Sequence, residues 1–362
     1  MQLPAPIRLA LLACAPYALA HSHTEFGCVH DEVNQHEGGV RDSGYFFSPQ
    51  AYEGDHLAEE SGQRRRRLTA TTHENLRVQI NVVSIDALSS SLQSFLSGTL
   101  LPSALDWVQH ALRVEPVSST LLAAPFCSSS FSGAGWTQCA SATAPTCGVN
   151  SDGSSYSIPS SLLASITTCS SCSGSGSCSG CSTSSAGAGA TDADFVLFVS
   201  AVNTGSCSGG TLAYASTCQR DQWDRPIFGY ANFCPSSLSA ASEDFAAQRA
   251  TAVHEVMHAL GFSSGSWPLF READGTPLTA RESDGLPASV STLCGDGVTR
   301  TALSVDSSTL EVASVRGSGA RCRRPAVSRA RSPFSRSNRN WVRSDTVIRC
   351  CERAPLRKGA TR

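Results

Sequence analysis

The sequence predicts an α+β domain in which a twisted sheet lies against one long helix. Two segments have strand patterns: residues 77–83 alternate polar and apolar side chains, and residues 195–199 form the short apolar run of a buried strand. Two others have helical patterns, namely residues 102–115 and a segment that starts near Ser242 and ends at Gly261. In the first of these helices, four apolar residues share one side: Leu105, Val108, Ala111 and Leu112.

The 362-residue chain joins two parts of opposite charge, although its formal net charge is only −2. Residues 1–315 carry 14 arginines and 28 acidic residues, whereas residues 316–362 carry 13 arginines, one lysine and two acidic residues. With 41% hydrophobic residues, the chain is not a disordered polyelectrolyte. Its near-neutral charge gives no reason to expect nucleic acid as a partner.

The first 20 residues have the pattern of a secretory signal peptide. Arg8 precedes an apolar run over residues 9–19, and Ala18 and Ala20 provide the small residues that a signal peptidase requires. A buried N-terminal helix is the alternative interpretation. No later stretch reaches the roughly 18 to 20 apolar residues of a membrane span. Because 16 cysteines also suit an oxidising compartment, we expect a secreted or extracellular protein with disulfide bonds.

Residues 21–67 form an acidic, histidine-rich stretch that ends in four consecutive arginines, Arg64 to Arg67. The arginines fit either a solvated surface loop or a processing site for a protease that cleaves after basic residues. Their position between an irregular leader and the first strand pattern favours processing. We therefore interpret residues 21–67 as a propeptide and residues 68–317 as the main domain.

Within that domain, residues 148–193 form an insert dominated by serine, glycine and alanine. The insert contains two Cys-x-x-Cys pairs, Cys169 with Cys172 and Cys178 with Cys181. Such pairs can bind zinc, but only five residues separate them, against roughly 15 to 20 in a zinc ribbon. The spacing therefore favours disulfide bonds in a long loop.

The motif His254-Glu255-Val256-Met257-His258 lies in the second helical segment. Residues four apart share one face of a helix, so both imidazoles can bind one zinc ion, with Glu255 beside them as the general base of peptide hydrolysis. Gly261 would let the chain turn sharply after this helix. The alternative is a surface helix that carries two histidines by chance.

Residues 254–263 resemble the active-site helix of the leishmanolysin-like zinc metalloproteases, a branch of the metzincins. Residues 101–117, 192–199 and 210–235 also resemble segments of that family, and the likeness covers about residues 25–315. The resemblance implies a metzincin-like fold and a secreted or surface endopeptidase that acts on protein or peptide substrates. It leaves the family's cell-adhesion and membrane-associated roles open, and no oligomer is predicted.

The resemblance also implies synthesis as a zymogen. Residues 28–31 resemble the family's propeptide motif, so Cys28 would be an inhibitory ligand whose thiolate occupies the zinc until cleavage near Arg67 removes it. The alternative for Cys28 is an ordinary disulfide partner.

The chain departs from the family in its third zinc ligand. No histidine follows His258, no methionine follows Met257, and Ser264 stands where the compact metzincin spacing would place the histidine. A two-histidine site falls short of the three protein ligands of an ordinary catalytic zinc. Either a carboxylate takes the place of the third histidine, or the C-terminal part of the chain does not correspond to the family's sequence. The candidate carboxylates are Glu272, Asp274, Glu282 and Asp284.

Likeness to the family ends at about residue 317, and residues 318–362 are rich in arginine and serine without an apolar period. This segment is either the product of a shifted frame, an unspliced intron or a misassembled gene, or a genuine basic tail that binds acidic surfaces. Residues 68–315 contain 11 cysteines, an odd number that places at least one disulfide partner elsewhere. The sequence thus predicts a zinc endopeptidase. The alternative is a catalytically inactive homologue that acts in extracellular adhesion or binding.

Overall fold

The computed structural model describes residues 73–272, 275–282, 285–293, 299–306, 309–314 and 321–325. The proposed signal peptide, the propeptide, Cys28 and the four arginines lie outside the described residues. The described residues fall into two compact units. The first ends at Phe262, and the second starts at Ser263. In the described part of the chain, no helix is both long and apolar enough to cross a membrane.

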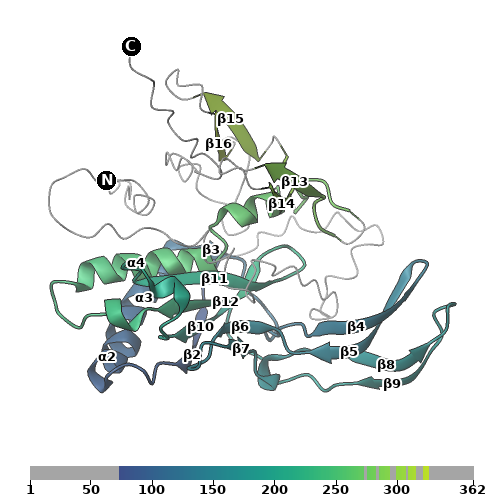
Figure 1. Cartoon of the computed structure of the whole chain (residues 1–362), viewed down its shortest axis with the longest axis horizontal. Helices are drawn as coiled ribbons and strands as arrows, with labels where there is room; N and C mark the ends of the chain where they lie inside the picture. The colour runs from purple at the N-terminus through teal and green to yellow at the C-terminus, as the bar shows by residue number, and fades with distance from the viewer. Residues whose placement is uncertain are drawn as a thin grey trace, which may run out of the picture. The chain divides into compact units, whose positions relative to one another are not determined.

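A four-stranded sheet forms the centre of the first unit (Figure 1). Its order is β11-β12-β10-β2, where β2 is Val78–Ser84, β10 is Phe195–Ser200, β11 is Ala213–Arg220 and β12 is Pro226–Phe233. Strand β10 runs parallel to β2 and β12, and β11 runs antiparallel to β12 at the edge. Every residue of β10, β11 and β12 is buried. Both strands predicted from the sequence are confirmed, as is the α+β class.

The first predicted helix is shifted in the structure. Helix α3 spans Leu101–Ala111 and continues from α2 (Ser90–Phe95) through a π-helical turn, η3 (Leu96–Leu100). The predicted helix began at Pro102, and proline is tolerated in the first turn of a helix because its missing N–H has no partner to lose there. Here the helix instead runs through it by a π turn, in which the Leu101 N–H donates to the Leu96 carbonyl. The helix also ends four residues earlier than predicted, and Ala111 is exposed.

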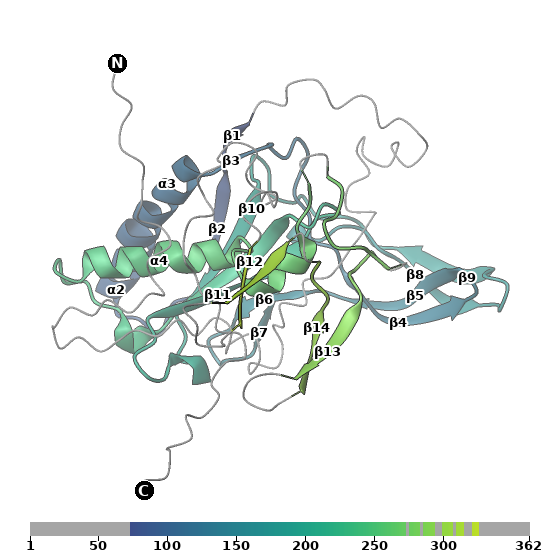
Figure 2. The same ribbon diagram turned by 90° about the horizontal axis from the view of Figure 1, so that it is seen from above.

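Helix α4 spans Phe245–Ala259 and lies against β11, β12 and α3 (Figures 1 and 2). Ser242, near which the helix was predicted to start, does not cap it: Asp244 holds the N-cap position without a side-chain bond, and the Ser242 hydroxyl donates to Glu243. A buried amide replaces the cap. Gln248 donates to the Ser239 carbonyl at 2.7 Å and accepts from its N–H at 3.1 Å, which ties the preceding loop to the helix.

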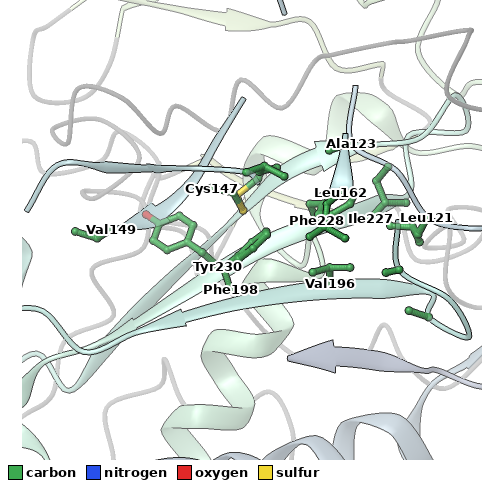
Figure 3. Packing of buried hydrophobic residues seen from close by; sticks show 14 of the residues in the cluster. Leu121, Ala123, Cys147, Val149, Leu162, Val196, Phe198, Ile227, Phe228 and Tyr230 are labelled. Atoms are coloured by element: carbon green, nitrogen blue, oxygen red, sulfur yellow. A yellow bond between two sulfur atoms is a disulfide. The ribbon is translucent and has the colours of Figure 1, made fainter. Parts of the chain in front are cut away.

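One hydrophobic cluster of this unit lies on the face of the sheet opposite to α4 (Figure 3). The rings of Phe198 and Phe228 stack with their centroids 6.3 Å apart, and Tyr156 packs on Phe198 at 5.6 Å. The Cys147–Cys218 disulfide joins the start of the insert to β11 beside these rings. The unit also contains four short strands: β1 (Glu74–Asn75), β3 (Arg113–Val114), β6 (Thr146–Val149) and β7 (Ser155–Ser157).

The serine-rich insert contributes a hairpin where a long loop was predicted. Strands β8 (Thr167–Cys172) and β9 (Cys178–Thr183) pair antiparallel and lie beside a second hairpin, β4 (Phe126–Gly133) with β5 (Trp136–Thr143) (Figures 1 and 2). Serine has little strand preference, so composition suggested a loop. Disulfides between directly opposite residues, Cys169–Cys181 and Cys172–Cys178, hold the strands together instead.

The same hairpin decides between disulfides and zinc for the paired cysteines. Residues three apart in a strand project to opposite faces, so Cys169 and Cys172 cannot converge on one metal while β8 stays extended. Cysteines in the described part of the chain form five disulfides, the other three being Cys127–Cys139, Cys147–Cys218 and Cys207–Cys234. This leaves Cys294, which lies outside the described residues, as the odd cysteine of residues 68–315.

A buried carboxylate fixes the start of β10. Asp194 is fully buried; it accepts from the Arg77 side chain at 3.0 Å and from the Val117 N–H at 2.7 Å, and it lies 3.4 Å from Arg225. Burial raises its pKa, but the hydrogen bonds from Arg77 and Val117 and the charge of Arg225 outweigh burial, so the pKa lies below its ordinary 3.8.

We expect this carboxylate to make folding sensitive to acid. Because folding lowers the pKa of Asp194, its contribution to stability is complete above the ordinary value and is lost as pH falls through the lowered value of the folded state. Denaturant titrations between pH 6 and pH 2 should show an extra loss of stability below about pH 4 that an Asp194→Asn variant lacks. Equal acid sensitivity of both proteins would contradict this role.

The second unit contains two short hairpins, β13 (Ser289–Leu293) with β14 (Thr299–Leu303) and β15 (Leu310–Ser314) with β16 (Arg321–Pro325). It also contains a tandem repeat that sequence analysis missed: residues 271–277 and 281–287 share an Arg-Glu-x-Asp-Gly-x-Pro pattern. Both copies make the same turn, with the first and last residues bridged and the glycine at positive φ.

Candidate metal centre

Helix α4 brings the two predicted histidines together. Their Nε2 atoms are 2.9 Å apart, and the rings are nearly perpendicular with centroids separated by 4.4 Å. One helical turn separates His254 from His258, so the helix alone produces this approach. Both side chains are half-buried and therefore retain access to solvent.

Glu255 lies on the buried side of the same helix turn. Glu255 is only 5% exposed, and its helix neighbours Ala252, Val256 and Ala259 are fully buried. Glu255 directly follows His254 in the helix, and its burial limits the contact of the carboxylate with bulk water. Sequence reasoning placed Glu255 beside the imidazoles, and the structure adds that it is an interior residue of the domain.

Two residues of the sheet fix the last turn of α4, and sequence reasoning missed both. The Thr217 hydroxyl on β11 donates to the Ala259 carbonyl at 2.9 Å. Gly229 on β12 allows the close approach, because a Cβ there would lie 3.1 Å from the Ala259 oxygen and 2.9 Å from the Ser216 oxygen. Threonine and glycine within buried strands give no sequence signal of such a role.

We expect Gly229→Ala to destabilise the domain by about 1–3 kcal/mol, since its methyl group would lie 2.7 Å from the Phe195 ring and would also meet backbone oxygens that can move only with the helix or strand. The matched control is Gly98→Ala, where a Cβ meets no atom within 4 Å and should be neutral or mildly stabilising. Urea midpoints of both variants measure the difference. Equal midpoints would mean that α4 is not seated by Gly229.

The turn after α4 returns the main chain to His258. Gly261 has a φ of 83°, which confirms the predicted sharp turn. Its N–H donates to the His258 carbonyl at 2.9 Å, and the Phe262 N–H donates to the Met257 carbonyl at 3.0 Å. This is the Schellman arrangement of a helix end. The Phe262 carbonyl then lies 2.9 Å from Nδ1 of His258.

The donor set fits part of a zinc site. Two nitrogens bound to tetrahedral zinc at about 2.0–2.1 Å lie roughly 3.3 Å apart, so the 2.9 Å pair of His254 and His258 needs only a small adjustment. Among the described residues, no three His, Cys, Asp or Glu side chains lie together as a metal site. Glu272 and Glu282 occupy the turns of the tandem repeat in the second unit, while Asp274, Asp284 and Cys28 lie outside the described residues.

Comparisons with known proteins match the part of the chain that contains α4. The leishmanolysin family model matches residues 168–321, which include α4 and its motif. A leishmanolysin-like peptidase of Caenorhabditis elegans is 36% identical over 227 residues, 59% of this chain and 32% of that protein. The Drosophila melanogaster leishmanolysin-like peptidase is 31% identical over 286 residues, 76% of this chain and 40% of that protein.

A shorter match reaches another group of metallopeptidases. The ciliated left-right organizer metallopeptidase of Mus musculus is 35% identical over 98 residues, 26% of this chain and 14% of that protein. The chain thus spans well under half the length of these relatives. By the family match and by its likeness to the leishmanolysin-like peptidases, the chain belongs to the leishmanolysin family.

Proposed function

We propose that this chain carries the catalytic region of a secreted or surface zinc metalloendopeptidase that hydrolyses peptide bonds in protein or peptide substrates. The observation that carries the proposal is the convergence of His254 and His258, 2.9 Å apart, on a helix that lies within the family match. Membership of a family whose relatives are named metallopeptidases supports the same reaction.

In this mechanism, His254 and His258 would hold the zinc. When bound, the zinc would supply a Lewis acid that polarises the scissile carbonyl and makes water more acidic. Glu255 takes a proton from the attacking water at a carboxylate oxygen and delivers it to the leaving amine nitrogen. Its position next to His254, with 5% exposure, keeps this proton transfer away from bulk water.

The proposal includes synthesis as a zymogen with the metzincin-like arrangement of helix and sheet. Cys28 would bind the zinc as an inhibitory thiolate, and cleavage after Arg67 would release it. The signal peptide directs the chain to an extracellular or surface location, where the disulfides are stable.

A second candidate function is an inactive homologue that acts as an extracellular adhesion or binding protein. The absence of histidine from the sequence after His258 favours it, because a catalytic zinc ordinarily has three protein ligands. A carboxylate ligand from Glu272 or Glu282 would restore the count and keep the chain an enzyme.

The experiment compares the chain cleaved at Arg67 with a version that carries the C-terminal region of a full-length leishmanolysin-like relative. Both are assayed on a casein-type substrate with and without a chelator, and their zinc content is measured. Chelator-sensitive cleavage by the chain supports the enzyme. Zinc binding and cleavage only by the extended version would make the chain as written the inactive homologue. Loss of zinc in Glu272→Ala or Glu282→Ala would identify a carboxylate ligand.

A further inference from the structure

The C-terminal turn of α4 does more than end the helix. An ordinary Schellman turn satisfies the last carbonyls with the N–H groups of the two residues that follow, and here Gly261 and Phe262 do so. The same turn leaves the Phe262 carbonyl 2.9 Å from Nδ1 of His258. A main-chain oxygen therefore contacts the nitrogen of His258 that does not face His254.

This contact determines where the proton of the neutral imidazole lies. A carbonyl oxygen only accepts hydrogen bonds, so Nδ1 of His258 must be the donor. In the neutral ring, Nε2 then carries the lone pair. That lone pair is directed at Nε2 of His254, 2.9 Å away, on the side where a shared metal would bind.

We infer that Gly261 is a positioning residue, whose left-handed backbone holds His258 in the Nδ1–H tautomer with its Nε2 lone pair ready for a metal. The inference rests on the proposed function only for its consequence in metal binding, because the tautomer is a property of the metal-free chain. Outer partners of this kind commonly fix the orientation and tautomer of histidine ligands.

The acceptor of this hydrogen bond is a main-chain carbonyl, so substitutions at Phe262 and at Gly261 should affect the bond differently. Changing the Phe262 side chain leaves its carbonyl in place, so the hydrogen bond survives. Changing Gly261 alters the carbonyl's position, because a φ of 83° is strained for residues with a branched Cβ and tolerated by asparagine. Thr217 and Gly229 contact Ala259, two residues before Gly261, so the strain cannot be relieved by moving the helix end freely.

The test compares the wild-type chain with Gly261→Val, Gly261→Asn and Phe262→Ala. Long-range nitrogen–proton NMR of the imidazoles, recorded without metal at pH 8, reports the tautomer of His258. Zinc affinity is measured in parallel by calorimetry, and urea titration checks folding. We expect Nδ1–H in the wild type, in Gly261→Asn and in Phe262→Ala. In Gly261→Val we expect a mixture of tautomers and zinc affinity about 10–100-fold weaker.

A wild-type His258 in the Nε2–H form would overturn the inference, and so would a folded Gly261→Val variant with the wild-type tautomer and affinity. If Gly261→Val does not fold, the wild-type spectrum and the Gly261→Asn variant still decide. The two proposals fail separately. If the wild-type chain has the Nδ1–H tautomer but binds no zinc, the metalloendopeptidase proposal is refuted and the positioning role of Gly261 stands. If the chain binds zinc but His258 has the Nε2–H tautomer, the positioning role is refuted and the metalloendopeptidase proposal stands.

Discussion

Replacing Glu255 with glutamine should lower kcat of the processed enzyme by about 10²–10⁴-fold while leaving its zinc content unchanged. Glutamine keeps the size of the side chain but can neither take a proton from water nor return one to the leaving amine. Steady-state cleavage of a casein-derived peptide, with zinc measured by atomic absorption, separates catalysis from metal binding. In the proposed mechanism the effect should fall on kcat, because Glu255 would transfer protons while His254 and His258 would hold the metal.

Two variants, one in α4 and one just before it, serve as controls. His258→Ala should lose zinc and activity together. Glu243→Gln, at an exposed position just before α4, should change neither. A Glu255→Gln enzyme with more than a tenth of wild-type kcat would remove Glu255 from the proton transfer, and lost zinc in that variant would make the residue a ligand.

Replacing Asp194 with alanine should destabilise the first unit by about 3–5 kcal/mol. The carboxylate is fully buried between Arg77 and Arg225, and its removal takes a charged partner from two partly buried arginines and the acceptor from the Val117 N–H. Because Asp194 precedes the central strand β10, the loss should reach the whole sheet. Guanidinium or urea unfolding monitored by tryptophan fluorescence measures the change.

The neighbouring Asp192 supplies a matched control. Its side chain is 95% exposed and lies 3.8 Å from the same Arg77, so an ion pair is present without burial. Asp192→Asn removes that charge and suits the residue's φ of 51°, and it should cost less than about 1 kcal/mol. Asp194→Asn should cost several times more. Similar costs for the two asparagine variants would mean that burial does not make the Asp194 pairs important.

The parts that sequence predicted correctly are those that depend on local spacing. His254 and His258 meet because four residues make one helical turn, and the strands at 77–83 and 195–199 follow from short apolar patterns. The turn at Gly261 was also predictable, because a glycine directly after a helix pattern is a local signal.

The parts that sequence could not predict depend on contacts between distant segments. Thr217 reaches Ala259 across 42 residues of chain, and no pattern in β11 announces that its hydroxyl will meet a helix end. The hairpin of the serine-rich insert depends on which cysteines face each other, and sequence leaves that pairing open. The helix before Pro102 was missed because proline is a common helix start, whereas here a π turn accommodates it.

The Cys147–Cys218 disulfide has a consequence for how this protein responds to proteolysis. The bond encloses residues 148–217, so the whole β8–β9 hairpin belongs to a covalent ring closed at the central sheet. A nick anywhere in that ring opens it without releasing either fragment. The nicked chain would migrate as one species on a non-reducing gel and separate only after reduction, so surrounding proteases could cut the insert while the sheet beneath α4 stays joined.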